Sequence, residues 1–155
     1  MWNKAQVIAY DFVIATSIFF ITLIIVFSYW VYAMKEVEET RSSKEAMISL
    51  LRASNLWFIE GYPKYWDNQT VLELGLSNDR RINATKVEFL NQMGYQKVLS
   101  LLNLGRFNVF YNVTSSGSVI TEFGAEPQNA KNIYKIVRFG VLENKVVRIE
   151  TILWE

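Results

Sequence analysis

One uncharged segment near the N-terminus constrains this chain more than any other feature. Residues 12–33 read FVIATSIFFITLIIVFSYWVYA and contain no charged side chain. As a helix with a rise of about 1.5 Å per residue, this segment would reach about 33 Å, enough to cross a hydrocarbon core of about 30 Å. Tyr29, Trp30 and Tyr32 lie where an interfacial aromatic belt would be expected. The sequence therefore predicts a membrane-inserting helix.

The charged and reactive side chains exclude several classes of function. The chain has 16 basic and 15 acidic residues among 155 and a net charge of +1, so we expect no nucleic-acid partner. Cysteine and histidine are both absent. A disulfide, a zinc-thiolate site and a thiol nucleophile are therefore excluded, and the commonest general base is missing. We expect no catalytic residue, no metal and no cofactor, and hence no enzymatic activity.

The length of the apolar segment indicates that it is kept in the mature protein. A secretory signal peptide has an apolar region of about 7–15 residues and then a small-residue cleavage site. Residues 12–33 are longer, and Met34, Lys35 and Glu36 follow them directly. Lys4 favours a cytoplasmic position for the N-terminal end.

Asp11 is an acidic residue directly before the apolar segment. An ionisable group at the start of a membrane helix is costly unless it is solvated or paired, which makes Asp11 a functional candidate. Alternatively, its side chain reaches the lipid headgroups or interacts with the positive end of the helix dipole. The residues alone leave both interpretations open.

A short motif, Lys4-Ala5-Gln6, precedes Asp11 and the apolar helix. This arrangement resembles the class III signal peptide of archaeal type IV pilin-like proteins. The resemblance implies that a prepilin peptidase cuts between Ala5 and Gln6. Residues 1–5 would then be the signal peptide, and residues 6–33 the transmembrane or filament-core helix.

The same resemblance implies a role for Asp11 in assembly. The cut would give Gln6 a new α-ammonium group. Five residues turn a helix by about 140° and advance it by about 7.5 Å, so Asp11 cannot easily meet that amine within one chain. In a bundle of staggered helices, Asp11 could pair with the amine of a neighbouring copy and so reduce the cost of burying two charges. The family often has an acid at the fifth mature position, which is Tyr10 here, whereas Asp11 is sixth.

Residues 34–60 are predicted to continue the helix as an amphipathic segment. They contain no proline or glycine before Gly61, and their apolar residues recur at partly helical spacing. Ser42 and Glu45 match a capping box, so the helix could restart there instead of running through. The closely spaced glutamates of residues 34–60 are expected to form a solvated helix face rather than a metal or acid-base site.

Residues 61–155 are expected to form a small α+β ectodomain with short helices and an antiparallel β-sheet. Asn83 can cap a helix over residues 84–93, and a second helix is expected over 95–103. Period-2 patterns and turn residues predict strands over 70–76, 107–114, 118–123, 133–141 and 145–154. The segment GYPKYWDNQTVLELGLSNDRRINATKVEFLNQMGYQKVLSLLNL also resembles a region of archaeal pilin-like ectodomains.

Three Asn-x-Ser/Thr sequons, at Asn68, Asn83 and Asn112, are candidate N-glycosylation sites. Asn83 could instead serve as the helix cap, and Asn68 as an ordinary loop residue. The resemblance adds that archaeal surface proteins are commonly glycosylated.

The resemblance implies a structural subunit of an archaeal type IV pilus-like surface filament. Its expected partners are the prepilin peptidase, an assembly ATPase with its membrane platform, and further copies in a homo-oligomeric helical filament. The precursor would lie in the membrane, and the filament would be extracellular and serve adhesion or motility. The alternatives are a permanently membrane-anchored ectodomain that binds a partner or belongs to a secretion apparatus, and a membrane-bound hydrolase, for which no catalytic set is visible.

Overall fold

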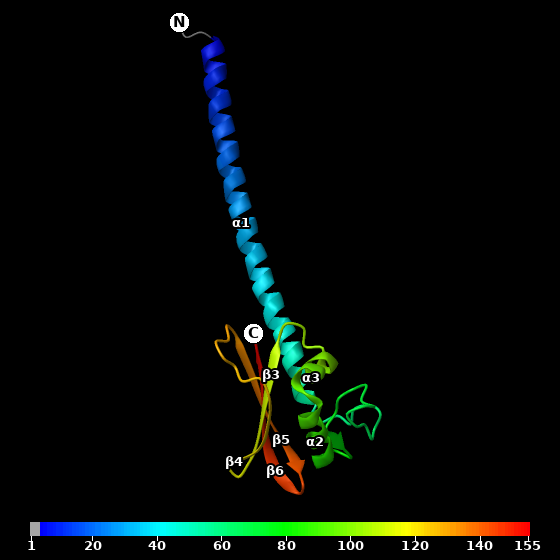
Figure 1. Cartoon of the computed structure of the whole chain (residues 1–155). Helices are drawn as coiled ribbons and strands as arrows, with labels where there is room; N and C mark the ends of the chain where they lie inside the picture. The colour runs from blue at the N-terminus through cyan, green and yellow to red at the C-terminus, as the bar shows by residue number, and fades with distance from the viewer. Residues whose placement is uncertain (1–3) are drawn as a thin grey trace. The chain divides into compact units, whose positions relative to one another are not determined.

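One long helix begins the chain in this computed structural model, which describes residues 4–155, with side chains from Tyr10 onward (Figure 1). This helix, α1, covers Lys4–Asn55 without interruption. The alternative of a restart at Ser42 is therefore wrong, and the absence of glycine and proline explains why the helix continues. Two compact units divide after Ser43, so the last turns of α1 belong to the C-terminal domain, Lys44–Glu155.

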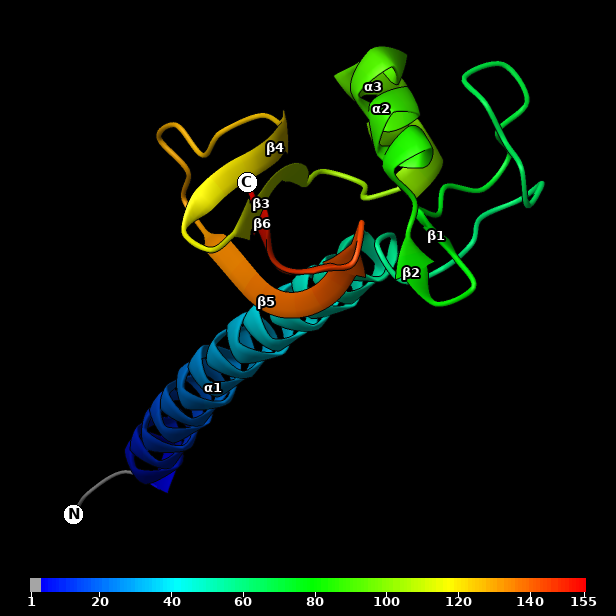
Figure 2. The ribbon, with the colours of Figure 1, turned by 90° about the horizontal axis from the view of Figure 1, so that it is seen from below.

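The C-terminal domain contains two short helices and six strands, and the predicted α+β fold class is confirmed. The helices, which pack against each other, are α2 (Ala84–Met93) and α3 (Tyr95–Leu102) (Figure 2). The strands are β1 (Ser77–Asn78), β2 (Arg81–Ile82), β3 (Asn108–Ser115), β4 (Ser118–Gly124), β5 (Ile133–Leu142) and β6 (Lys145–Trp154).

The strands form one sheet in the order β1-β2-β5-β6-β3-β4. The four long strands pair antiparallel, as predicted. The sheet as a whole is mixed, because β2 pairs parallel to β5 through Ile82 and Leu142. Strands as short as β1 and β2 have no room for a period-2 pattern, which is why this pairing was not predicted.

The predicted strand over residues 70–76 is wrong. This segment has only an isolated antiparallel bridge between Glu73 and Tyr62. At Gly75 the chain passes so close to Gly61 that a Cβ on Gly75 would lie 2.2 Å from the Gly61 nitrogen. The apolar residues of the segment are nevertheless buried, namely Val71, Leu74 and Leu76. The segment is therefore a packed loop, whose hydrophobicity the sequence could show but whose path it could not.

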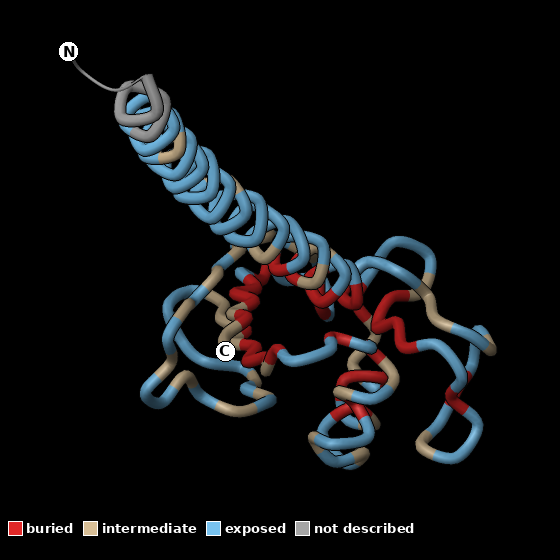
Figure 3. Tube along the Cα trace, turned by 90° about the horizontal axis from the view of Figure 1, so that it is seen from above, coloured by how far each residue is buried: buried red, intermediate tan, exposed pale blue. Residues whose placement is uncertain are grey.

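The core of the domain lies between the last turns of α1 and the inner face of the sheet (Figure 3). Ala46, Leu50 and Ala53 are buried on the helix. Alternate residues of β6 are buried as well, namely Val147, Ile149, Thr151 and Leu153. Tyr111 on β3 donates a hydrogen bond to the Ala53 carbonyl, 3.0 Å away, and its ring meets Trp57 edge-on. The end of α1 is thus an integral part of the domain.

Candidate functional site

The first candidate site is the surface of α1 before the C-terminal domain. Large apolar side chains of residues 10–33 point to every side of the helix, with exposed fractions between 49% and 73%. The pale-blue segments of Figure 3 show the same exposure along this stretch. Soluble monomers rarely expose a continuous apolar surface of this extent, which marks a membrane or protein contact.

The polar side chains within this stretch do not interrupt its apolar character. Ser17 Oγ donates to the Val13 carbonyl at 2.8 Å, and Thr22 Oγ1 donates to the Ile18 carbonyl at 2.9 Å. Hydroxyls satisfied by their own helix can be placed in lipid or in an apolar bundle at low cost. Among the described residues, α1 is the helix that is long and apolar enough to cross a membrane.

The side chains of the predicted cleavage residues Lys4, Ala5 and Gln6 lie outside the described ones. Asp11 is described and exposed. Its role in assembly stays a prediction.

The three sequons occupy different settings. Asn83 caps α2, because its Oδ1 accepts from the main-chain N–H of Lys86 at 3.2 Å. Asn68 lies in the loop before β1, where its amide donates to Gln92 at 3.3 Å. Asn112 lies within β3, between β4 and β6, and is half-buried. Glycosylation of these residues stays a prediction.

Aromatic residues of the domain serve mainly as core. Trp66 and Tyr111 are buried, and burial raises the pKa of the Tyr111 hydroxyl far above its usual value. Tyr95 is half-buried, and its hydroxyl accepts from the main-chain N–H of Val109 at 3.1 Å. Tyr62 and Tyr65 are exposed. A broad aromatic binding surface is therefore not assembled from these five residues.

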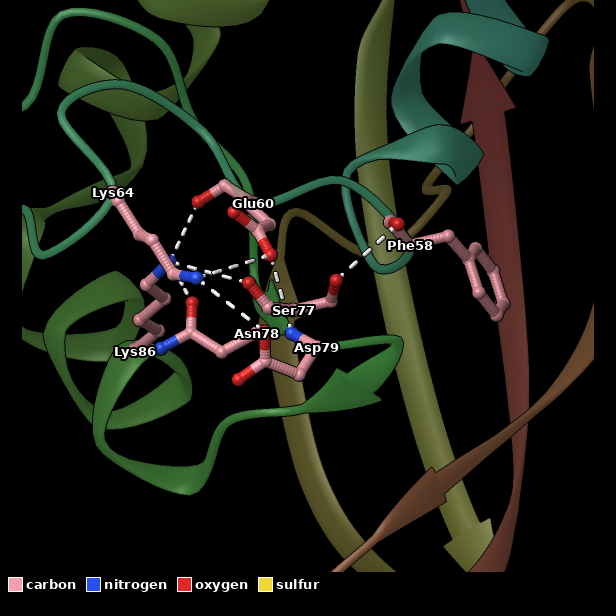
Figure 4. Close-up of polar contacts among 7 residues, drawn as sticks. All are labelled: Phe58, Glu60, Lys64, Ser77, Asn78, Asp79 and Lys86. Carbon is pink, nitrogen blue, oxygen red and sulfur yellow. Dashed lines mark hydrogen bonds and ion pairs between the residues drawn. The ribbon is translucent and has the colours of Figure 1, made fainter.

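A second cluster, which the sequence did not predict, surrounds the amine of Lys86 (Figure 4). The residue is 3% exposed. Its Nζ donates to the carbonyls of Glu60 at 2.6 Å and Ser77 at 3.2 Å, and to Oδ1 of Asn78 at 2.6 Å. A lysine is rarely buried unless its amine is satisfied in this way.

The position of Lys86 on α2 contained a signal that could have found this cluster. Lys86, Val87 and Leu90 are the buried residues of α2, so the lysine shares the spacing of the apolar face. A lysine on the apolar face of a short helix predicts a buried amine, but its acceptors come from loops that local periodicity does not place.

The carboxylate of Glu60 lies at the edge of this cluster. Its Oε1 accepts from the main-chain N–H of Asp79 at 3.2 Å and lies 3.7 Å from Nζ of Lys64. Burial lowers the pKa of Lys86 below its usual 10.5, and the charge of Lys64 acts the same way, whereas the Glu60 carboxylate opposes both. Among the described residues, no three His, Cys, Asp or Glu side chains gather as metal ligands.

Comparison with known proteins adds no relative: no family model, no curated protein and no solved structure matches this chain. What is established is a class of architecture, in which a long apolar helix near the N-terminus is followed along the chain by a small α+β domain, consistent with a pilin-like protein.

Proposed function

We propose that this chain is a structural subunit of an archaeal type IV pilus-like surface filament. The observation that carries the proposal is the all-round apolar surface of residues 10–33, next in the chain to a domain that buries its own core. A permanent contact for such a surface is either lipid or other apolar helices.

In the proposed pathway, the precursor waits in the membrane, and a prepilin peptidase removes residues 1–5. An assembly ATPase with its membrane platform then transfers the subunit from lipid to the growing filament. Apolar burial between helices supplies cohesion, while the C-terminal domains form the outer coat. Contacts of this head-to-tail kind do not close on themselves, which suits helical growth.

The proposal places Asp11 in the helix bundle, where its carboxylate pairs with the Gln6 amine of a neighbouring copy. An unpaired charge in an apolar bundle is costly, so each partner stabilises the other. Adhesion or motility belongs to the assembled filament in this account and requires no catalytic group.

The N-terminus of the native protein tests the proposal. We expect mass spectrometry to find Gln6 as the first residue of chains recovered from extracellular fibres. Retention of Met1 in chains confined to the membrane would contradict the filament proposal and would support the permanently anchored alternative.

Asp11→Asn tests the assembly role separately. We expect a several-fold loss of fibres with normal cleavage and membrane insertion. The matched control is Glu36→Gln, which removes an exposed acid from the polar part of α1 and should leave fibre yield unchanged. Equal yields from both variants would refute the role of Asp11.

A further inference from the structure

The amine of Lys86 is oriented by two main-chain oxygens. Its Nζ lies 2.6 Å from the Glu60 carbonyl oxygen and 3.2 Å from the Ser77 carbonyl oxygen (Figure 4). The third N–H of the charged amine donates to Oδ1 of Asn78. Once the amine loses this proton, its lone pair faces the Asn78 amide.

The Lys86 amine and the Asn78 amide are close enough for a reaction between them. Nζ is 2.6 Å from Oδ1 of Asn78. Since a C=O bond is about 1.23 Å long, Nζ lies no more than about 3.8 Å from Cγ. Reacting atoms in near-attack geometry are about 3–3.5 Å apart, so only a small adjustment separates the pair from that geometry.

Burial of Lys86 favours the uncharged amine, which is the nucleophilic form. The residue is 3% exposed. Burial lowers the pKa of the amine, and so does Lys64, against the opposing charge of Glu60. A desolvated lysine is activated for attack on a carbonyl carbon in the same way.

Glu60 is placed to move the proton. Its carboxylate accepts the main-chain N–H of Asp79, the residue after Asn78, and its charge acts on the amine of Lys86. A carboxylate in this place can accept the proton that the attacking amine loses and return it to the departing nitrogen.

We propose that Lys86 and Asn78 form an intramolecular isopeptide bond. The lone pair of Nζ attacks Cγ of Asn78, and the bond between Cγ and Nδ2 breaks. Glu60 transfers a proton from Nζ to the leaving nitrogen, which departs as ammonia. A primary amine and a carboxamide become a secondary amide and ammonia, so the reaction needs no oxidant, reductant or other co-reactant.

The bond would tie strand β1 to the first turn of α2. Asn78 is the last residue of β1, and Lys86 lies in the first turn of α2. Between them lie strand β2 and the Asp79-Arg80 turn, in which both residues have positive φ. Closing this loop covalently restricts the unfolded chain and thereby stabilises the domain. The proposal concerns the domain alone and does not depend on filament assembly.

Peptide mapping of the full chain, purified in detergent from a host without N-glycosylation, tests the bond. Trypsin cannot cut after a lysine whose amine is acylated. We therefore expect a branched product that joins residues 65–80 to residues 82–97. Its mass should be lower by one ammonia than the summed masses of the two unlinked peptides. The intact mass alone is insufficient, because an N-terminal Gln6 can also cyclise with loss of ammonia.

Three variants identify the groups involved. Lys86→Arg keeps a positive charge but should abolish the branched product, and Glu60→Gln should reduce its fraction several-fold. Lys97→Arg is the matched control, because Lys97 also donates to an asparagine, through the Asn68 carbonyl, but is exposed. Cleavage after Lys86 in the unaltered chain, with residues 65–80 recovered as a linear peptide, would overturn the proposal whether or not the variants fold.

Discussion

Residues 10–33 and residues 44–55 belong to the same helix, yet their apolar side chains have opposite surroundings. Leu23 in the first stretch is 49% exposed, whereas Leu50 in the second is 3% exposed. The second stretch packs its apolar side chains on the sheet of its own domain, and its other positions are mostly polar or exposed. The first stretch has apolar residues on every side. Hydrophobicity alone therefore does not decide which partner a helix needs, and the distribution of apolar residues around it does.

The largest expected effect comes from a charge within the first stretch. Ile24→Lys should sharply reduce membrane insertion and abolish fibres, because a lysine at the centre of a membrane helix costs about 2.5–3.5 kcal/mol on insertion scales. The measurement is the fraction of chain in the membrane and in extracellular fibres.

Phe139→Lys is the matched control for Ile24→Lys. Phe139 on β5 is 66% exposed, close to the 61% of Ile24, but it belongs to the domain. We expect normal insertion and only a small change in stability, because exposed substitutions on the domain remain in water. If Phe139→Lys reduces membrane insertion and fibre yield as much as Ile24→Lys does, the proposed difference between the helix and the domain is wrong.

Truncation inside the domain is expected to affect the stability of the domain without abolishing insertion or fibres. Leu50→Ala should lower the free energy of unfolding by about 2–5 kcal/mol, because it opens a cavity against the sheet. Denaturant unfolding of the full chain in detergent, followed by tryptophan fluorescence, measures this loss. Leu23→Ala should change the same transition by less than about 0.5 kcal/mol. A comparable loss in both variants would show that the first stretch also stabilises the domain.

The smallest effect concerns acid stability of the sheet. The hydrogen bond from Lys135 to Glu150, at 2.8 Å, and the charges of Lys135 and Arg148 lower the pKa of the Glu150 carboxyl below its usual 4.5, against the opposing effect of burial. Because the folded-state pKa is lowered, this stabilisation is complete above 4.5 and is lost as the pH falls through the lowered value.

Glu150→Gln should therefore reduce the decline in stability on acidification. Unfolding midpoints measured between about pH 7 and pH 3 test this expectation. Glu122→Gln, on the exposed face of the edge strand β4, is the control. If the unfolding midpoint of Glu150→Gln declines on acidification as much as that of the unaltered chain, this ion pair contributes nothing measurable.

The regular elements could be predicted because their signals are local. The cap at Asn83, the helix over residues 84–93 and the four long strands follow from capping and alternation, and the structure confirms them. The mixed sheet and the loop over residues 70–76 could not be predicted, because they depend on close contacts between distant residues, such as Gly61 with Gly75.

The candidate sites divide in the same way. The apolar helix surface is a property of consecutive residues, so its sequence alone predicted it. The Lys86 cluster brings together Glu60, Asn78 and the start of α2, and its acceptors include main-chain oxygens that have no residue signature. Only the folded chain places these atoms around one amine.

The covering of α1 in fibres tests the central claim most directly. The chain has no cysteine, so single cysteines can be introduced without background. Ile24→Cys and Val119→Cys replace residues of similar exposure, 61% and 56%, in the helix and in the domain. In detergent-free extracellular fibres, a water-soluble maleimide should label Val119→Cys and should not label Ile24→Cys until the fibres are denatured. Equal labelling in intact fibres, or a chain found only in membranes with Met1 retained, would contradict the account.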